Sequence, residues 1–206
     1  FLPILLLFLQ VFGAKAQTTI TASYVSSVIT FSTGVSYITF AVKNNNNYPI
    51  ILSNMTCVQA NLYENNVYTL LYSSTSLAGA PIIPSAAWNT VATSIAPITT
   101  STVTQVVPFD CIGLTIPPFT TYRFALQGSK GTAVRGGVTP NSFSAGGVNL
   151  LVGDNVATGG QVGFFGWQTL GPIGTPYFFE GSITFVTPGA LTDLQIRTIT
   201  KPTSVC

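Results

Sequence analysis

The sequence predicts an all-β protein folded as an antiparallel β-sandwich of about nine or ten strands. Three observations predict it. Apolar and polar residues alternate through most of the chain, and no window shows the period of about 3.6 residues that marks an amphipathic helix. Segments rich in Thr, Val, Ile, Tyr and Phe are separated by Gly, Pro and Asn at intervals of about 8 to 12 residues, the spacing typical of sandwiches.

The chain opens with an apolar stretch, residues 1–12, followed by Gly13-Ala14-Lys15-Ala16. The two alanines form the pattern after which signal peptidase cuts, so we interpret residues 1–16 as a cleaved signal peptide and Gln17 as the first residue of the mature protein. A membrane anchor is the alternative, but about 12 apolar residues are fewer than the roughly 20 that a spanning helix needs. We therefore expect a secreted protein, extracellular or at the cell surface, with no membrane partner after the leader is removed.

Residues 17–187 are expected to form one sandwich domain, and the polar residues 188–206 an extended C-terminal tail. The first strand region, 18–31, is rich in β-branched residues. Residues 35–42 alternate cleanly, which predicts a half-buried strand with one apolar face. The Asn-rich segment 44–49 then favours a turn, because Asn tolerates left-handed backbone and Pro fixes its own φ.

Two antiparallel pairs are predicted in the middle of the chain, after a short strand at 50–52. Residues 57–63 and 67–72 flank a Glu-Asn-Asn turn, which is typical of a hairpin. Residues 88–95 and 103–109 flank a Thr/Ser-rich segment and are expected to pair in the same way.

The last strands surround a less regular region. Residues 121–126 alternate again after a Pro-Pro stop. The glycine-rich region 128–174 predicts only short strands, around 148–152 and 162–165. Residues 177–186 are rich in aromatic and β-branched residues and predict one long closing strand.

The composition is unusual in its lack of charge. Only 6% of residues are charged, against about 25% in ordinary globular proteins, there is no His, and the mean hydropathy is +0.50. A net charge of +2 without a basic stripe argues against a nucleic-acid partner. Three explanations are open: neighbouring subunits cover the surface, glycans coat it, or Ser, Thr and Asn make it polar without charge.

The expected export suggests roles for the three cysteines and for one N-glycosylation sequon. Cys57 and Cys111 lie in or beside predicted strands, and we expect them to form a disulfide, since disulfides persist outside the cell. Cys206 is then left over, either as an intermolecular thiol that links chains or with a partner beyond the sequence. Asn54-Met55-Thr56 is an N-glycosylation sequon, and we expect a glycan on Asn54 at a strand end; a simple turn cap is the alternative.

The order of several motifs resembles the accessory β-sandwich modules of secreted and cell-surface proteins, which are similar in fold to adhesion and fibronectin-like domains. The motifs are Val106-Val107-Pro108-Phe109, Leu114 to Phe124, Gly147-Val148-Asn149-Leu150 and Phe179 to Phe185. The resemblance spans residues 35–187 and implies a jelly-roll or Ig/fibronectin-like sandwich, with no catalytic residue. The chain departs from the pattern in its two cysteines and in Pro118-Phe119, where a turn glycine is usual.

Chemistry-bearing residues are scarce. With no His and few carboxylates, a metal site or a bound cofactor is not expected, and the one carboxylate pair to consider for glycoside hydrolysis is Asp110 with Glu180. Trp88, Trp167 and Tyr177 are a candidate sugar-stacking platform, although aromatics at alternating sandwich positions more often belong to the core.

These observations favour a secreted structural protein that is not an enzyme. It would be a self-assembling, glycosylated subunit of an extracellular filament, sheath or matrix, with copies of itself as partners, because long uncharged strands invite pairing. A carbohydrate-binding or cell-adhesion module, with glycans as partners, is the alternative, and a glycoside hydrolase ranks third.

Overall fold

The computed structural model describes residues 16–22, 28–31, 36–59, 65–74, 88–96, 105–131, 133–136, 142–152, 162–164, 168–169 and 177–187. Of the predicted leader, only Ala16 is among them, as the first residue of β1. Trp167, Cys206 and the whole predicted tail 188–206 lie outside the described residues. The leader, the tail and the role of Cys206 therefore stay predictions.

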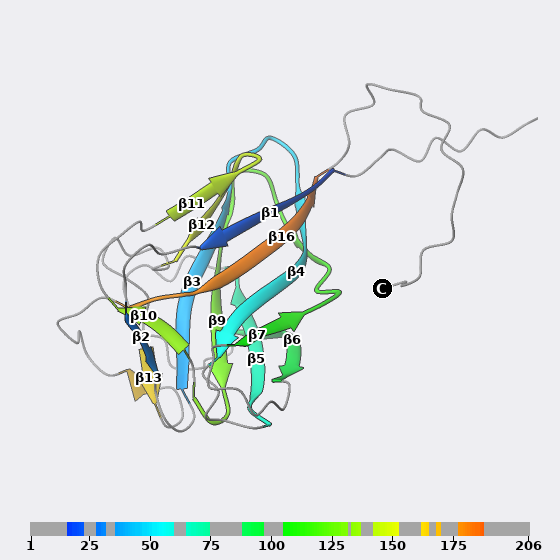
Figure 1. Ribbon diagram of the computed structural model, residues 1–206. Coiled ribbons are helices and arrows are strands. Elements are labelled where there is room, and N and C mark those ends of the chain that lie inside the picture. The colour runs from blue at the N-terminus through cyan, green and yellow to red at the C-terminus, as the bar shows by residue number, and fades with distance from the viewer. Residues whose placement is uncertain are drawn as a thin grey trace, which may run out of the picture.

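The protein is an all-β antiparallel sandwich, as the alternation predicts (Figure 1). The described part of the chain contains sixteen strands, more and shorter than predicted, and no helix. No helix in this part is therefore long and apolar enough to cross a membrane. The strands are β1 Ala16–Ala22, β2 Val28–Phe31, β3 Ser36–Asn44, β4 Ile50–Gln59, β5 Val67–Ser73, β6 Asn89–Ile95, β7 Gln105–Phe109, β8 Leu114–Ile116, β9 Thr121–Gly128, β10 Ala133–Gly136, β11 Ser142–Ala145, β12 Val148–Leu151, β13 Val162–Phe164, β14 Gln168–Thr169, β15 Tyr177–Phe178 and β16 Gly181–Thr187.

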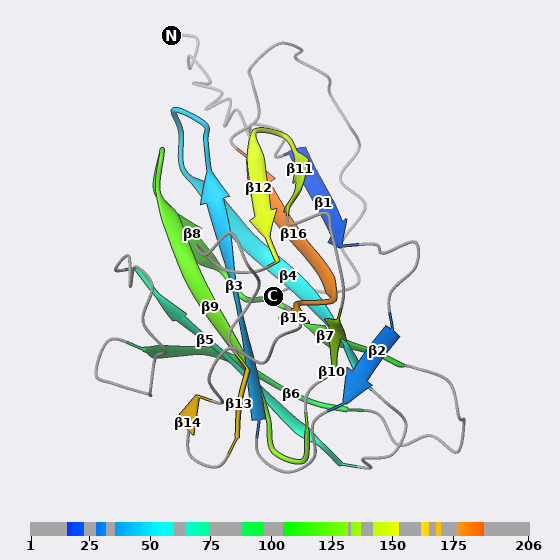
Figure 2. The same cartoon turned by 90° about the vertical axis from the view of Figure 1, so that its left-hand side faces the viewer.

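Two main sheets form the layers (Figure 2). The five-stranded sheet has the order β1-β16-β4-β7, and β8 also pairs with β4 beyond the end of β7. The eight-stranded sheet has the order β11-β12-β3-β9-β5-β6, with β13 and β14 attached beside the first half of β3. A small third sheet joins β15, β10 and β2.

The core lies between the two main sheets. Ile38, Phe40 and Val42 of β3 are fully buried on one face, which is the face predicted from the alternation. The strand is not half-buried as predicted, because Tyr37, Thr39 and Ala41 on its other face are buried too. The Phe40 ring stacks on Phe124 of β9 at 5.3 Å between centroids and on Phe179 at 4.1 Å. Such aromatic pairs stabilise the fold by about 0.5–1.5 kcal/mol each beyond their buried area.

The predicted strand pairs in the middle of the chain are wrong, although the strands themselves are present. β4 is one continuous strand that pairs with β16, β7 and β8, whereas β5 pairs with β6 and β9 in the other sheet. β6 and β7 are likewise in different sheets, and the side chain of Ser94 bridges them by donating to the Pro108 carbonyl at 2.6 Å. The chain therefore passes from one sheet to the other between β4 and β5 and again between β6 and β7, where the sequence predicts hairpins.

The predicted closing strand is interrupted at residues 179–180. β15 belongs to the small sheet, and β16 begins at Gly181, whose φ of +155° turns the chain into the five-stranded sheet. A Cβ at this position would overlap the Thr56 carbonyl oxygen. Gly181 thus lets β16 approach β4 closely.

Candidate functional site

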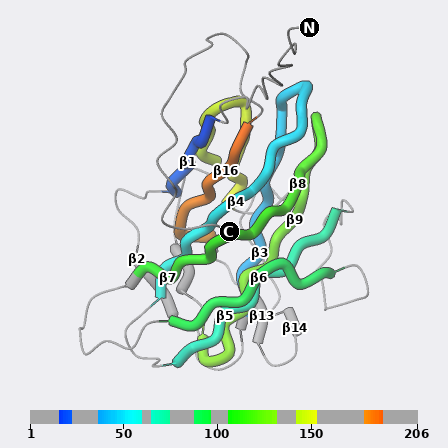
Figure 3. The backbone as a smooth tube through the Cα atoms, turned by 90° about the vertical axis from the view of Figure 1, so that its right-hand side faces the viewer, coloured from blue at the N-terminus to red at the C-terminus, as the bar shows by residue number. Residues whose placement is uncertain are grey.

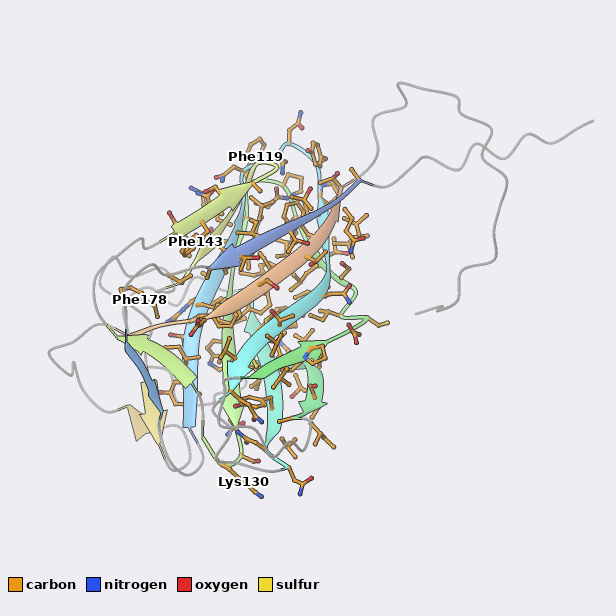
Figure 4. All side chains as sticks on the ribbon, in the orientation of Figure 1. Phe119, Lys130, Phe143 and Phe178 are labelled. Atoms are coloured by element: carbon orange, nitrogen blue, oxygen red, sulfur yellow. The ribbon has the colours of Figure 1, made fainter. Side chains whose placement is uncertain are left out.

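The outward face of the five-stranded sheet is the most distinctive surface of the molecule. None of the residues of β1, β16, β4, β7 and β8 is charged. The described charged residues lie outside these strands, although Asp110 directly follows β7 and Glu180 directly precedes β16. Lys130 lies at one end of the sandwich, and the exposed Phe119 at the other (Figure 4). Such a sheet lacks the charges that usually keep one protein molecule from packing on another.

Hydroxyl groups run across this face in two rows. One row follows the register from Thr19 through Thr184 to Asn54, and the hydroxyls of Thr19 and Thr184 are hydrogen-bonded at 2.9 Å. The other row follows Thr21, Ser182 and Thr56 in the same way; the last two hydroxyls are hydrogen-bonded at 2.7 Å.

The rows arise from the two-residue period of the strands. Thr-x-Thr in β1, Ser-x-Thr in β16 and Asn-x-Thr in β4 all place their polar residues outward, while apolar residues such as Ile20, Ile183 and Met55 point into the core. The strands of this face are therefore polar but uncharged, and several of its hydroxyls are already paired with one another.

Asn54 lies on this face, but in the middle of β4 and not at a strand end as predicted. The register between β4 and β16 shifts beside it, and its Nδ2 donates to Asp110 Oδ1 at 2.8 Å. Its side chain is partly exposed, on the same face as Thr56 of the sequon. Glycosylation of Asn54 stays a prediction.

The edge of the five-stranded sheet is formed by β1. All seven of its residues pair with β16, and within the described residues no strand pairs with its other edge (Figure 3). Its sequence, Ala-Gln-Thr-Thr-Ile-Thr-Ala, has no charge and no Pro, and Gln17, Thr19 and Thr21 are exposed. Monomeric proteins usually block an edge strand with charged residues or Pro, and β1 has neither.

The candidate sugar platform is contradicted at Trp88. Its side chain is only 8% exposed and packs against Tyr37 and Ala125 on the outer face of the eight-stranded sheet. A buried ring cannot stack on a sugar. Trp167 lies outside the described residues, and for Tyr177 only the backbone, in β15, is described.

Sequence reasoning missed Arg123, which is fully buried in β9 on the same face as Tyr37. Burial raises the pKa of Tyr37 to about 12, and the nearby charge of Arg123 opposes part of that rise. An Arg in an alternating strand is ordinarily expected to face solvent, so the sequence carried no signal for this buried charge.

The predicted Cys57–Cys111 disulfide is absent. Cys57 is a free thiol, fully buried in the core, and burial raises its pKa. The register places Val107 opposite Cys57, so Cys111 lies four residues further along, about 13 Å away at strand spacing. Cysteines so far apart cannot be bridged.

Asp110 and Glu180 are not brought together. Asp110 lies beside Asn54, whereas Glu180 directly precedes Gly181, which pairs with Cys57 on the opposite side of β4. The two carboxyl groups therefore lie on opposite sides of β4 and about three or four residues apart along it. This separation exceeds the roughly 5–9.5 Å between the two catalytic carboxyl groups of glycosidases. Among the described residues, no group of three or more His, Cys, Asp or Glu could hold a metal ion.

Comparisons with known proteins give no family. No protein-family model matches the chain, and no curated protein matches it.

Solved structures of virus particles match the chain in part. A structure of infectious bursal disease virus, Gt strain, is 16% identical, with a TM-score of 0.37, and the match covers 86% of this chain and 35% of that one. Particles derived from a mutant VP2 protein of the same virus give 15% identity, a TM-score of 0.34 and coverage of 85% and 32%. The chain thus spans about a third of the length of these viral chains, and the likeness supports no conclusion about function.

Proposed function

We propose that this protein is a secreted structural subunit that assembles with copies of itself, through the five-stranded sheet, into an extracellular filament, sheath or matrix. One observation carries the proposal: the strands of a whole sheet, which has an exposed outward face and an edge that no described strand pairs with, contain no charged residue. The leader-like N-terminus supports secretion.

Two physical arguments connect the uncharged sheet to assembly. The cores of protein interfaces are depleted in charge, because an unpaired charge that is buried costs several kcal/mol. In addition, hydroxyls that are already hydrogen-bonded in pairs, such as Thr19 with Thr184 and Thr56 with Ser182, lose fewer bonds to water when a partner covers them. The face is therefore suited to being buried against another molecule.

The test is sedimentation velocity and negative-stain imaging of the chain from Gln17 at low micromolar concentration. We expect large, regular assemblies. Val106→Lys places a charge on the outward face of β7, at a side chain that is 58% exposed, and should weaken association at least tenfold, because the charge would be buried without a partner.

Thr93→Lys is the matched control, since Thr93 is exposed on β6 of the other sheet. It should leave assembly unchanged. A stable monomer would overturn the proposal, and a stable monomer that binds neutral glycans would favour the carbohydrate-binding alternative.

A further inference from the structure

We infer that two copies join edge to edge through β1, as antiparallel strands related by a two-fold axis at Thr19, so that two five-stranded sheets become one continuous sheet. The inference rests on the proposed self-assembly and names the contact through which it starts. The partner is a second copy of this chain.

The first step is the open edge. β16 pairs with one side of β1 along its full length, and no described strand pairs with the other side, although β11 of the eight-stranded sheet packs against β1. In an extended strand, alternate backbone N–H and C=O groups point to that open side, where a partner strand can bind them. The exposed side chains along the outward face of β1 are those of Gln17, Thr19 and Thr21, which are uncharged and so do not repel a second copy.

The second step is the register. Thr19 is the central residue of β1 as the structure describes it. A two-fold axis at Thr19 pairs all seven described residues and sets Gln17 opposite Thr21 of the second copy, and Ala16 opposite Ala22. If the leader is cleaved before Gln17, five pairs remain, as many as an axis at Ile20 would give, but only the axis at Thr19 sets Thr19 opposite its own copy.

The third step is the agreement of the two faces. In an antiparallel pair centred on a residue, every outward residue meets an outward residue and every inward one an inward one. Thr19 therefore meets Thr19 of the second copy on the hydroxyl face, and Thr–Thr pairs across strands are favourable. The hydroxyl row through Thr19 and Thr184 would continue without a break into the second subunit. An axis between residues would instead set the buried Ile20 against exposed polar groups.

The test is disulfide trapping in the chain with its native cysteines kept, because Cys57 is buried and Cys111 is already disulfide-bonded; the unmodified chain is the background control. Directly opposed residues have Cα atoms about 4.5–5.5 Å apart, within the range that a disulfide spans. Oxidised glutathione is the oxidant: it takes two electrons and two protons from the two thiols and leaves as two reduced glutathione molecules.

Thr19→Cys should form a covalent dimer on its own. Gln17→Cys and Thr21→Cys are the matched variants: each alone should stay monomeric on a denaturing gel, because its thiols would be about 13 Å apart, whereas a mixture of the two should cross-link. The mixture also provides an answer should Thr19→Cys fold poorly.

The outcomes separate this inference from the proposed function. If neither Thr19→Cys nor the mixture cross-links but the protein still assembles in sedimentation, the β1 contact is wrong and assembly uses another surface. If Gln17→Cys alone cross-links as well as Thr19→Cys, the register is wrong. If the protein is a monomer at every concentration, both the contact and the proposed function fall.

Discussion

Tyr37 lies buried on the outer face of the eight-stranded sheet, beside Trp88 and Ala125. Burial raises the pKa of its hydroxyl from 10.0 to about 12, with a smaller opposing effect of Arg123. Between these two pH values the unfolded chain releases the proton while the folded chain keeps it. The free energy of unfolding therefore holds its full contribution from Tyr37 below pH 10, and loses it as the pH rises to about 12.

Tyr37→Phe removes this dependence. We expect the wild-type protein to lose about 2–3 kcal/mol more stability than the variant between pH 10 and pH 12, since each pKa unit corresponds to about 1.4 kcal/mol. Urea unfolding at a series of pH values measures the difference. Equal losses for the two proteins would show that the hydroxyl titrates alike in both states.

At this scale the sequence was informative about residue type but not about side-chain environment. The inward face of β3 was predicted correctly from alternation, because an apolar stripe along a strand packs into the core. For Trp88 the core was the favoured interpretation and a binding platform the alternative, because the sequence does not show which residues cover the ring. Cys57 lay in a strand as expected, but its pairing depended on a register that a single strand does not encode.

At the scale of elements, β16 depends on how it begins. Gly181 has a φ of +155°, and a Cβ there would overlap the Thr56 carbonyl oxygen and approach the Phe179 ring. A methyl group at Gly181 would force the backbone at Thr56 to move. This movement would disturb the pairing of Gly181 with Cys57 in the five-stranded sheet.

Gly181→Ala should therefore lower the free energy of unfolding by about 2 kcal/mol or more. Gly113→Ala is the control, because Gly113 also has a positive φ, of +68°, but a Cβ there meets nothing within 4 Å; it should cost about 1 kcal/mol. Chemical denaturation measures both. An equal loss at the two positions would mean that φ strain alone, and not the contact with β4, sets the requirement for glycine.

Most strands could be predicted from the sequence, but their partners could not. The segments that became β3, β5, β9 and β12 were located by alternation and turn residues. The expected hairpins failed because β4 pairs with strands distant in sequence, such as β16, and because β6 pairs with β5 and not with β7. Local turn signals carry no information about such pairing.

At the scale of the whole molecule, the absence of charge from the five-stranded sheet determines how assembly should respond to salt. Contacts without charged groups are not screened by ions. We expect the association measured by sedimentation to change by less than about threefold between about 0.05 M and 1 M NaCl, and sulfate to strengthen it by favouring burial of surface.

A drop of tenfold or more in NaCl would instead mean that charged residues outside this sheet, such as Lys43 or Lys130, make the contacts. The low overall charge predicted some form of covered or neutral surface, but not which one, because composition does not say on which sheet the few charges fall.

The pairing of β1 and β4 with β16 also sets the order of events during folding. Thr56 and Ser182 are 126 residues apart in the chain, and Thr19 and Thr184 are 165 apart. Contacts so distant in sequence form slowly, and β16 must be synthesised before β1 has its partner, whereas β4 can pair earlier with β7 and β8. A nascent chain thus has no completed five-stranded sheet, so the edge proposed to join subunits comes into existence only after nearly all of the described chain has emerged. If the protein is exported as proposed, this order delays assembly until export is well advanced.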